Sequence, residues 1–316
     1  MTTIIIPTLL TDPELLQECL DSVFSSTTTQ TFEVMVVCNI PQEKSKKTLS
    51  KLHLYNATVS HMGVNAGFTG AVNAGIQKSN AEYIVLLNDD ATASPDWLDQ
   101  LVNTQQQTQA DMVASTIYLG GSGTIDSQGF TFYWRGKAYP LLQKRGTSHL
   151  KSEQAGCLNK KKNIPHLSGE GDHWLNNQQF FTSNTPKFFR EPFGPDAAAC
   201  LYTRKLFDTV GLFDDRFFAY LEDVDLALRA RKAGMYCALA KDGVAYHHKH
   251  ATSGAFPRFK ATQDMKNWWR IVLYTYPKKS WRKFWPQILL ERGRNLSGWM
   301  KSLALAQKAK TKYTTR

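Results

Sequence analysis

The first half of the chain alternates short apolar runs with segments of helical spacing, and this order constrains the fold more than any other feature of the sequence. Parallel strands joined by crossover helices produce such an order, because each helix returns across one face of the sheet. The sequence therefore predicts an α/β fold with a mostly parallel central sheet and helices on both faces. The expected strands span 3–8, 32–38, 57–60, 82–87 and 111–117, and the expected helices span 12–26, 43–52, 68–78 and a segment from 94 onward.

The second half begins with an irregular stretch, from 118 to 193, that is rich in Gly, Ser, Asn, aromatic residues and Lys. A structureless loop of that length is unusual in a compact domain, so we expect hairpins there and a mobile segment around 144–173. Regular patterns return after this stretch. They predict strands over 196–203, 235–240 and 244–247, a helix near 204, and a helix over 222–233 that ends at Gly234.

The net charge of +11 is concentrated at one end of the chain. The segment 260–316 holds 14 of the 38 Lys and Arg residues but only 2 of the 27 Asp and Glu residues, so the rest is nearly neutral. Trp and Tyr interleave with these basic residues, a composition typical of a helical segment on an anionic membrane leaflet. A packed helix pair with a solvated basic face, or an oligomer interface, explains the same composition. Nucleic acid is not an expected partner, because no recognition motif accompanies the charge.

The cysteines and the N-terminus indicate a cytoplasmic protein. Five cysteines are widely spaced and include no C-x-x-C pair, which argues against both a disulfide framework and a zinc site. The chain enters a strand-like run almost at once, without the pattern of a signal peptide, and no apolar run is long enough to span a membrane. We therefore expect a cytoplasmic protein that is at most peripheral on the inner face of the plasma membrane.

Two adjacent carboxylates follow the predicted strand 82–87. Asp89 and Asp90, preceded by Asn88, lie at the carboxyl end of this strand, where open α/β sheets bind ligands. Paired carboxylates in a loop hold a divalent cation of the kind that bridges nucleotide phosphates. A turn that leads into the next helix explains the same residues, because Asn and Asp initiate turns. From these residues alone, both interpretations stay open.

The segment 63–75, "GVNAGFTGAVNAG", contains four glycines and lies between a strand and a helix. Small residues there would let a ligand approach the backbone closely, although a tight turn alone would also require glycine. It matches neither a dinucleotide fingerprint nor a phosphate-binding P-loop.

Two further pairs of residues are candidates for chemistry. Glu222 and Asp223 begin a predicted helix, where a carboxylate could act as a general base, although favourable interaction with the helix dipole also explains them. His247 and His248 end a predicted strand and could deliver one imidazole to a metal. Because neighbouring side chains in a strand point to opposite faces, only one of them would reach a given site.

The order of these motifs resembles the family 2 glycosyltransferases, in particular their bacterial rhamnosyltransferase-like branch. The resemblance covers roughly 2–254 and implies a glycosyltransferase-A fold. It implies a nucleotide-sugar-binding half over 1–117 and an acceptor-binding and catalytic half over 118–257. The resemblance does not extend to the irregular middle segment or to the tail, where composition predicts a basic, aromatic, helical extension over 258–316. The segments that carry it are "IIIPTLL", "VMVVCN", "GVNAGFTGAVNAGI", "AEYIVLLNDDATASPDWLDQL", "AAACLYTRKLFDTVGLFDDRFFAYLEDVDLALRARKAGM" and "GVAYHHKHATSG".

The resemblance also implies roles for individual residues. Asp90 and His247 would hold Mg²⁺ or Mn²⁺, and Asp223, paired with Glu222, would be the catalytic base. Asn88 replaces the usual first acid of the metal motif, and Asn39 replaces an Asp that contacts the nucleobase. The residues expected to bind the nucleotide sugar are Thr8, Asn39, Asn65, Gly67, Asn73, Asn88 and Asp89.

The function implied by the resemblance is inverting, metal-dependent transfer of a sugar, with rhamnose as a candidate. The donor would be a dTDP- or UDP-sugar, and the acceptor a hydroxyl of a bacterial surface polysaccharide or lipid-linked glycan. Oligomerisation stays open. Nucleotidyl transfer is an alternative, because it also needs acids around a cation. A non-catalytic glycan-binding protein is another, since the neutral Asn39 and Asn88 leave room for lost chemistry.

Overall fold

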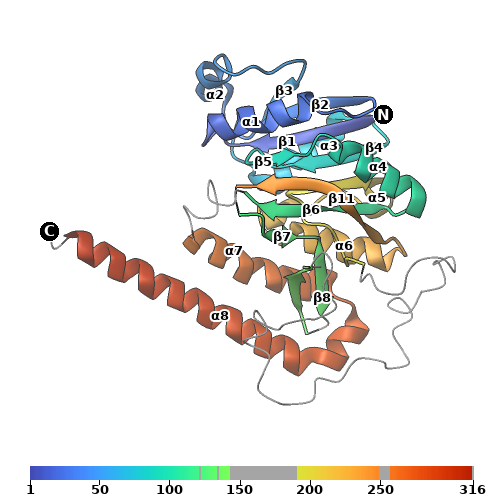
Figure 1. The fold of residues 1–316 in the computed structure, drawn as a ribbon. Coiled ribbons are helices and arrows are strands. Elements are labelled where there is room, and N and C mark those ends of the chain that lie inside the picture. The colour runs from blue at the N-terminus through green and yellow to red at the C-terminus, as the bar shows by residue number, and fades with distance from the viewer. Residues whose placement is uncertain (121, 134, 143–190, 249–256, 315–316) are drawn as a thin grey trace.

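The computed structural model describes residues 1–120, 122–133, 135–142, 191–248 and 257–314, and Figure 1 shows their arrangement. Strands and helices alternate through the first half, as the sequence predicts. The strands are β1 (Thr2–Thr8), β2 (Phe32–Cys38), β3 (Thr58–His61), β4 (Tyr83–Leu87), β5 (Ala91–Ala93), β6 (Met112–Leu119), β7 (Ile125–Ser127), β8 (Phe130–Tyr133), β9 (Lys137–Pro140), β10 (Ala199–Thr203) and β11 (Cys237–His247). The helices are α1 (Pro13–Phe24), α2 (Gln42–Leu49), α3 (Gly67–Lys78), α4 (Trp97–Thr108), α5 (Arg204–Val210), α6 (Glu222–Lys232), α7 (Pro257–Arg270) and α8 (Lys278–Thr314), with short turns η2 (Asp215–Phe217) and η3 (Ile271–Thr275).

The central sheet of the described residues has the order β3-β2-β1-β4-β10-β6-β11-β5, with β7 paired to the edge of β6. The first four strands are parallel, as predicted. The second part of the sheet is mixed, because β10 inserts antiparallel between β4 and β6, and β5 and β7 are also antiparallel to their partners. The predicted α/β class is therefore confirmed. Among the described strands, parallel pairing is confined to the neighbours β3-β2-β1-β4 and to the β6–β11 pair.

Side chains alternate along the strands and fill two cores, one on each face of the sheet. Ile4 and Ile6 of β1 point into the core under α1 and α4, whereas Ile5 points into the core under α3, α5 and α6. All three isoleucines are at most 1% exposed. This two-sided burial explains why the strand sequences are continuously apolar.

Two predictions for the second half need refinement. The strands expected over 235–240 and 244–247 form one strand, β11, with an irregularity between Ala240 and Val244. One expected hairpin is present as β8 and β9, whose antiparallel pairing makes a separate small sheet. The segment 144–173, expected to be mobile, lies outside the described residues.

The C-terminal extension is helical, and its first part belongs to the core. Trp268, Ile271 and Val272 are buried in the same core as α3 and α6. The indole N–H of Trp299 on α8 donates to the hydroxyl of Thr262 on α7 at 3.0 Å, so the two helices pack as a pair. Figure 1 shows α8 reaching past the domain toward the C-terminus. No helix in the described ranges is both long and apolar enough to cross a bilayer.

Candidate active site

The carboxyl end of β4 brings a carboxylate and an imidazole into contact. Asp90 lies in the turn between β4 and β5, and His247 ends β11, which pairs antiparallel with β5. This pairing places Nε2 of His247 3.0 Å from Oδ1 of Asp90, with side chains only 12% and 9% exposed. Burial lowers the pKa of His247, but the hydrogen bond and charge of Asp90 outweigh it and raise this pKa above its usual value.

The adjacent histidine is oriented differently. The backbone N–H of His248 donates to the carbonyl oxygen of Asp90 at 2.8 Å, and its ring packs against Gly120, whose missing side chain leaves the space. Of the two histidines, His247 is therefore the one whose imidazole contacts Asp90.

The Asp90–His247 pair fits a divalent cation that takes only a few of its ligands from the protein. Two ligand atoms about 2.1 Å from an octahedral cation and at right angles to each other are about 3.0 Å apart, the separation found here. Within the described residues no cluster of three or more His, Cys, Asp or Glu side chains forms a complete cage. A cation such as Mg²⁺ normally takes one or two protein ligands and completes its shell with phosphate oxygens and water. Asp90 and His247 supply that number.

Asp89 faces the opposite side of the turn, toward β1. Its Oδ2 accepts a 2.6 Å hydrogen bond from the hydroxyl of Thr8 at the end of β1. Burial is the main cause that raises the pKa of Asp89 to about 6, and the charge of Asp90 adds to it. Asn88 lies on the His247 side, with its Nδ2 at 3.5 Å from Nε2 of His247. Four polar residues were predicted at these strand ends, and three of them, Thr8, Asn88 and Asp89, therefore lie around Asp90.

The glycine-rich segment is held by the fourth, Asn39, which follows β2. Its Nδ2 donates to the carbonyl oxygen of Gly67 at 2.8 Å, and its Oδ1 accepts from the N–H of Ala66 at 2.8 Å. Asn65 contacts the same amide, with its Oδ1 3.1 Å from Nδ2 of Asn39. Asn39 is 4% exposed. Both ends of its amide hold the loop, and contact of Asn39 with a nucleobase stays a prediction.

Asn73 lies two turns into α3 and is buried against the segment before α6. Its Nδ2 donates to the carbonyl oxygen of Phe213 and to Asp215, at 2.8 and 2.6 Å, and its Oδ1 accepts from the N–H of Phe213 at 3.1 Å. Asn73 therefore joins the two halves of the domain. Its predicted contact with the nucleotide sugar is not tested by this geometry.

Glu222 and Asp223 form the first turn of α6, as predicted. Burial and the charge of nearby Asp196 raise the pKa of Asp223 to about 7, and burial with the charge of Asp223 raises the pKa of Glu222 well above its usual range. The Oε2 atom of Glu222 is buried and accepts no hydrogen bond in the described part of the chain. Such perturbed carboxyls are typical of sites where protons are transferred.

The acidic turn and the Asp90–His247 pair converge on Asp196. The N–H of Asn88 donates to the carbonyl oxygen of Ala198 at 2.9 Å, so the residues before β10 lie beside the end of β4. The charge of Asp196 raises the pKa of Asp223 and also that of His247. The charge of Asp196 therefore acts on both groups. No local pattern marks Asp196, because β10 pairs with β4, which lies more than a hundred residues earlier in the chain.

The loop that precedes α6 is conformationally unusual. Phe218, Tyr220 and Leu221 have φ angles of 65°, 69° and 66°, a region that bulky residues rarely adopt. The loop packs directly on the glycine-rich segment: a Cβ atom on Gly67 would lie 2.3 Å from the carbonyl oxygen of Phe218. Glycine at this position is thus required by the close approach of the two loops.

One side chain of the C-terminal extension holds this loop in place. Asn267 of α7 is fully buried, and Arg270 donates to its Oδ1 at 2.7 Å. Its Nδ2 lies within hydrogen-bonding distance of three carbonyl oxygens of the loop, those of Phe217, Ala219 and Tyr220, at 3.0, 2.9 and 2.7 Å.

The family model described as Glycosyl transferase family 2 matches residues 3–206, well over half of the chain. The chain belongs to this family. The matched region contains the Asn88–Asp90 turn and β10, while α6 and His247 lie beyond it.

Curated relatives of this family 2 chain include proteins of glycan assembly. It is 34% identical over 94 residues to N-acetylglucosaminyl-diphospho-decaprenol L-rhamnosyltransferase of Mycobacterium tuberculosis, covering 26% of this chain and 31% of that protein. It is 23% identical over 259 residues to the O-antigen biosynthesis protein RfbC of Myxococcus xanthus, covering 77% of this chain and 17% of that protein. The chain thus spans less than a third of the length of these relatives.

Solved glycosyltransferases show the same fold at low identity. The mannosyltransferase PcManGT of Pyrobaculum calidifontis, solved with GDP-Man and Mn²⁺, gives a TM-score of 0.57 at 14% identity over 98% of this chain and 75% of that one. GalNAc-T7, solved with UDP, GalNAc and Mn²⁺, gives 0.55 at 15% identity over 78% of this chain and 43% of that one. The predicted glycosyltransferase-A fold is therefore confirmed.

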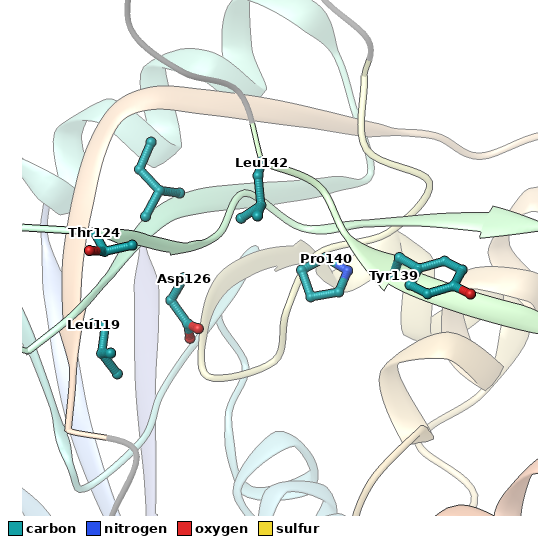
Figure 2. Close-up of a pocket in the computed structure, with 7 residues that line it drawn as sticks. Leu119, Thr124, Asp126, Tyr139, Pro140 and Leu142 are labelled. Atoms are coloured by element: carbon teal, nitrogen blue, oxygen red, sulfur yellow. The ribbon is translucent and has the colours of Figure 1, made fainter. Parts of the chain in front are cut away.

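A cavity lies beside the candidate metal ligands of this family 2 protein. Its volume is about 430 Å³, and Figure 2 shows Leu119, Asp126 and Pro140 among its lining residues. Leu119 is the strand partner of His247 in the β6–β11 register, and the charge of Asp126 contributes to the raised pKa of His247. The cavity therefore opens close to the Asp90–His247 pair, within the region from 118 that sequence reasoning left irregular.

Proposed function

We propose that the protein is an inverting, metal-dependent glycosyltransferase that moves a sugar from a nucleotide sugar to a hydroxyl of a glycan or lipid-linked glycan. The observation that carries the proposal is the convergence on Asp196 of the Asp90–His247 pair and the Glu222–Asp223 turn. A cation site and a carboxyl with a pKa near neutrality are what a single displacement at an anomeric carbon requires.

In the proposed reaction, Asp223 accepts the proton as the acceptor O–H bond breaks. The acceptor oxygen forms a bond to the anomeric carbon while the bond from that carbon to the phosphate oxygen breaks, with inversion, and the nucleoside diphosphate leaves. Burial and the charge of Asp196 support this role, because both raise the pKa of Asp223 and so make Asp223 a stronger base. Near neutral pH a substantial fraction of Asp223 is ionised and able to accept a proton.

Asp90 and His247 would hold Mg²⁺ or Mn²⁺, and Asn88 would orient the imidazole. Bound there, the cation would offset the negative charge that develops on the leaving phosphate. The Mn²⁺ in two solved proteins of the same fold supports this assignment. Thr8, Asp89, Asn39, Asn65 and Gly67 would shape the donor site, with Asp89 positioned by Thr8.

For the donor, we assign a dTDP- or UDP-sugar with rhamnose as the leading candidate sugar, on the strength of the rhamnosyltransferase relative. The acceptor would bind over the cavity beside His247, within the half from 118 to 257, while residues 1–117 bind the donor. The O-antigen relative supports a surface polysaccharide or lipid-linked glycan as acceptor. Such an acceptor would place the protein in the cytoplasm, at the inner face of the plasma membrane.

A thermal-shift screen of nucleotide sugars, with and without Mn²⁺, tests the proposal. We expect a rise in melting temperature for one donor that depends on Mn²⁺, because a ligand bound only by the folded state stabilises it. Release of nucleoside diphosphate in the presence of acceptor would then establish transfer. Release of pyrophosphate instead would indicate nucleotidyl transfer, and donor binding without turnover across a panel of acceptors would favour the non-catalytic glycan-binding alternative.

A further inference from the structure

The left-handed loop before α6 places Tyr220 between the glycine-rich segment and the acidic turn. Two residues before Tyr220, the carbonyl oxygen of Phe218 accepts from the backbone N–H of Thr69 at 3.2 Å, and Phe218 also packs on Gly67. Two residues after Tyr220, Glu222 begins α6. The side chain of Tyr220 therefore comes from the short connection that joins these two parts of the candidate site.

The helix α7 fixes the position of Tyr220. The Nζ atom of Lys260 lies 4.5 Å from the centroid of the Tyr220 ring, and the ring of Phe259 lies 6.2 Å away, tilted by 58°. The Nδ2 atom of Asn267 is 2.7 Å from the carbonyl oxygen of Tyr220. One helix thus holds both the ring and the backbone of this residue.

The hydroxyl of Tyr220 is a hydrogen-bond donor without a protein acceptor. Within the described ranges the contacts of Tyr220 go through its half-buried ring and its backbone, and none goes through its hydroxyl. Burial is the main cause that raises the pKa of Tyr220, and the charges of Asp264, Glu222 and Asp90 raise this pKa further. The phenol therefore keeps its proton at neutral pH and can donate it in a hydrogen bond.

The proposed transfer creates an acceptor for such a donor. The oxygen that joins the sugar to the diphosphate is an uncharged ester oxygen in the nucleotide sugar, and it becomes anionic when the bond to the anomeric carbon breaks. The carboxylates of Asp90, Glu222 and Asp264 would repel this new charge. A neutral O–H group would stabilise it, and would do so more strongly in the transition state than in the bound donor.

We propose that the hydroxyl of Tyr220 donates a hydrogen bond to the leaving phosphate oxygen, with Lys260 and Phe259 holding the ring. The O–H bond of Tyr220 is not broken in this step, and the proton that leaves the acceptor still goes to Asp223. The inference rests on the proposed function for its ligand, a nucleoside diphosphate, and adds to it a residue that acts on the leaving group.

Calorimetry on the full chain with Mn²⁺ tests the contact without an acceptor. The variant Tyr220→Phe removes the hydroxyl alone, and the probes are UDP and dTDP, each compared with UDP-glucose or dTDP-rhamnose. We expect Tyr220→Phe to bind the diphosphate about tenfold more weakly, because a hydrogen bond to a charged oxygen is lost. Affinity for the nucleotide sugar should change by less than about twofold, because its ester oxygen carries no charge.

The matched control is Tyr274→Phe. The ring of Tyr274 is 65% exposed and lies 4.6 Å from the guanidinium of Arg216, so this variant also removes a phenol hydroxyl from a ring that contacts a cation. Its affinities should stay within about twofold of the wild type. Melting temperatures that match the wild type for both variants would exclude misfolding.

Three results would overturn the inference. They are an unchanged affinity of Tyr220→Phe for the diphosphate, equal losses for the diphosphate and the nucleotide sugar, and a wild type that binds none of the probes. The proposed function fails separately. A wild type that binds the diphosphate more tightly than Tyr220→Phe but transfers no sugar would contradict the proposed reaction and support the contact.

Discussion

Replacing Asn267 with Ala removes the one described side chain of α7 that bonds to the carbonyl oxygens before the Glu222–Asp223 turn. An amide NH₂ group has two protons, so at most two of the three oxygens within reach hold a full hydrogen bond at one time. A buried acceptor left without its partner costs about 1–3 kcal/mol. Two such acceptors are left without a partner, so we expect Asn267→Ala to destabilise the loop by about 2–6 kcal/mol.

This cost is to be compared with the strain in the same loop. Each bulky residue in the left-handed region costs about 1–2 kcal/mol, and Phe218, Tyr220 and Leu221 all occupy it, for roughly 3–6 kcal/mol together. Because the two figures are similar, loss of Asn267 should let the loop relax to ordinary φ angles. Glu222 and Asp223 follow directly and would move with it.

Hydrogen exchange measures the relaxation without knowledge of the substrate. Amides in the loop, such as that of Ala219, which donates to the carbonyl oxygen of Phe217 at 2.7 Å, should exchange about 30-fold faster or more in Asn267→Ala. Once a donor is identified, turnover should fall at least about tenfold while its Kd changes less, because the base moves but the donor loops stay.

The control for this experiment is Gln263→Ala. Gln263 is a buried amide one turn earlier on α7, and its Oε1 accepts no hydrogen bond among the described residues. Its replacement should leave exchange in the loop near the wild-type rate. If both variants exchange alike at 217–221, the loop does not depend on Asn267 and the reasoning fails.

Four further predictions concern the site itself. Asp223→Asn should lower the transfer rate by at least about a hundredfold with little change in donor Kd, measured by nucleoside diphosphate release; retained activity would remove Asp223 as the base. Because folding raises the pKa of Asp223 to about 7, the native state holds this proton more tightly than the unfolded state does. The free energy of unfolding should therefore fall as pH rises from about 4 to about 7. Asp223→Asn should flatten that fall in urea titrations, and an unchanged slope would contradict the assignment. Asp90→Asn should abolish the Mn²⁺-dependent part of the thermal shift while leaving the metal-free melting temperature within a few degrees, roughly. Gly67→Ala should lower the free energy of unfolding by about 2–4 kcal/mol through its clash with Phe218. Gly63→Ala is the matched control: Gly63 has a similar φ of +76° but no atom within 4 Å of its Cβ position, so its replacement should cost only about 1 kcal/mol.

Local patterns in the sequence were sufficient for the elements of the first half and for their polar ends. The alternation of apolar runs predicted β1 to β4 within one or two residues. β1, β4 and most of β2 are buried on both faces, so nearly all of their side chains are apolar, whereas the short β3 is partly exposed. The turn at Asn88–Asp90 was found for the same reason, since it interrupts such a run. Thr8, Asn39 and Asp89 lie at the same edge because parallel strands end there together.

The remaining geometry depends on contacts between distant parts of the chain, for which a single sequence carries no signal. The insertion of β10 between β4 and β6 decides that Asp196 reaches the site, yet nothing near Asp196 in sequence encodes its neighbours. The left-handed Phe218, Tyr220 and Leu221 contradict local preference, so local reasoning could only have placed them elsewhere.

The C-terminal extension illustrates how composition can suggest a surface and conceal a structural role. Its Lys, Arg and Trp content indicates a membrane or a partner. Yet the same extension buries Asn267 against the loop before Glu222, a contact that a single uncharged Asn does not reveal in the sequence. Because α7 packs on α8 through Thr262 and Trp299, the helix that bonds to this loop is also the helix that anchors α8.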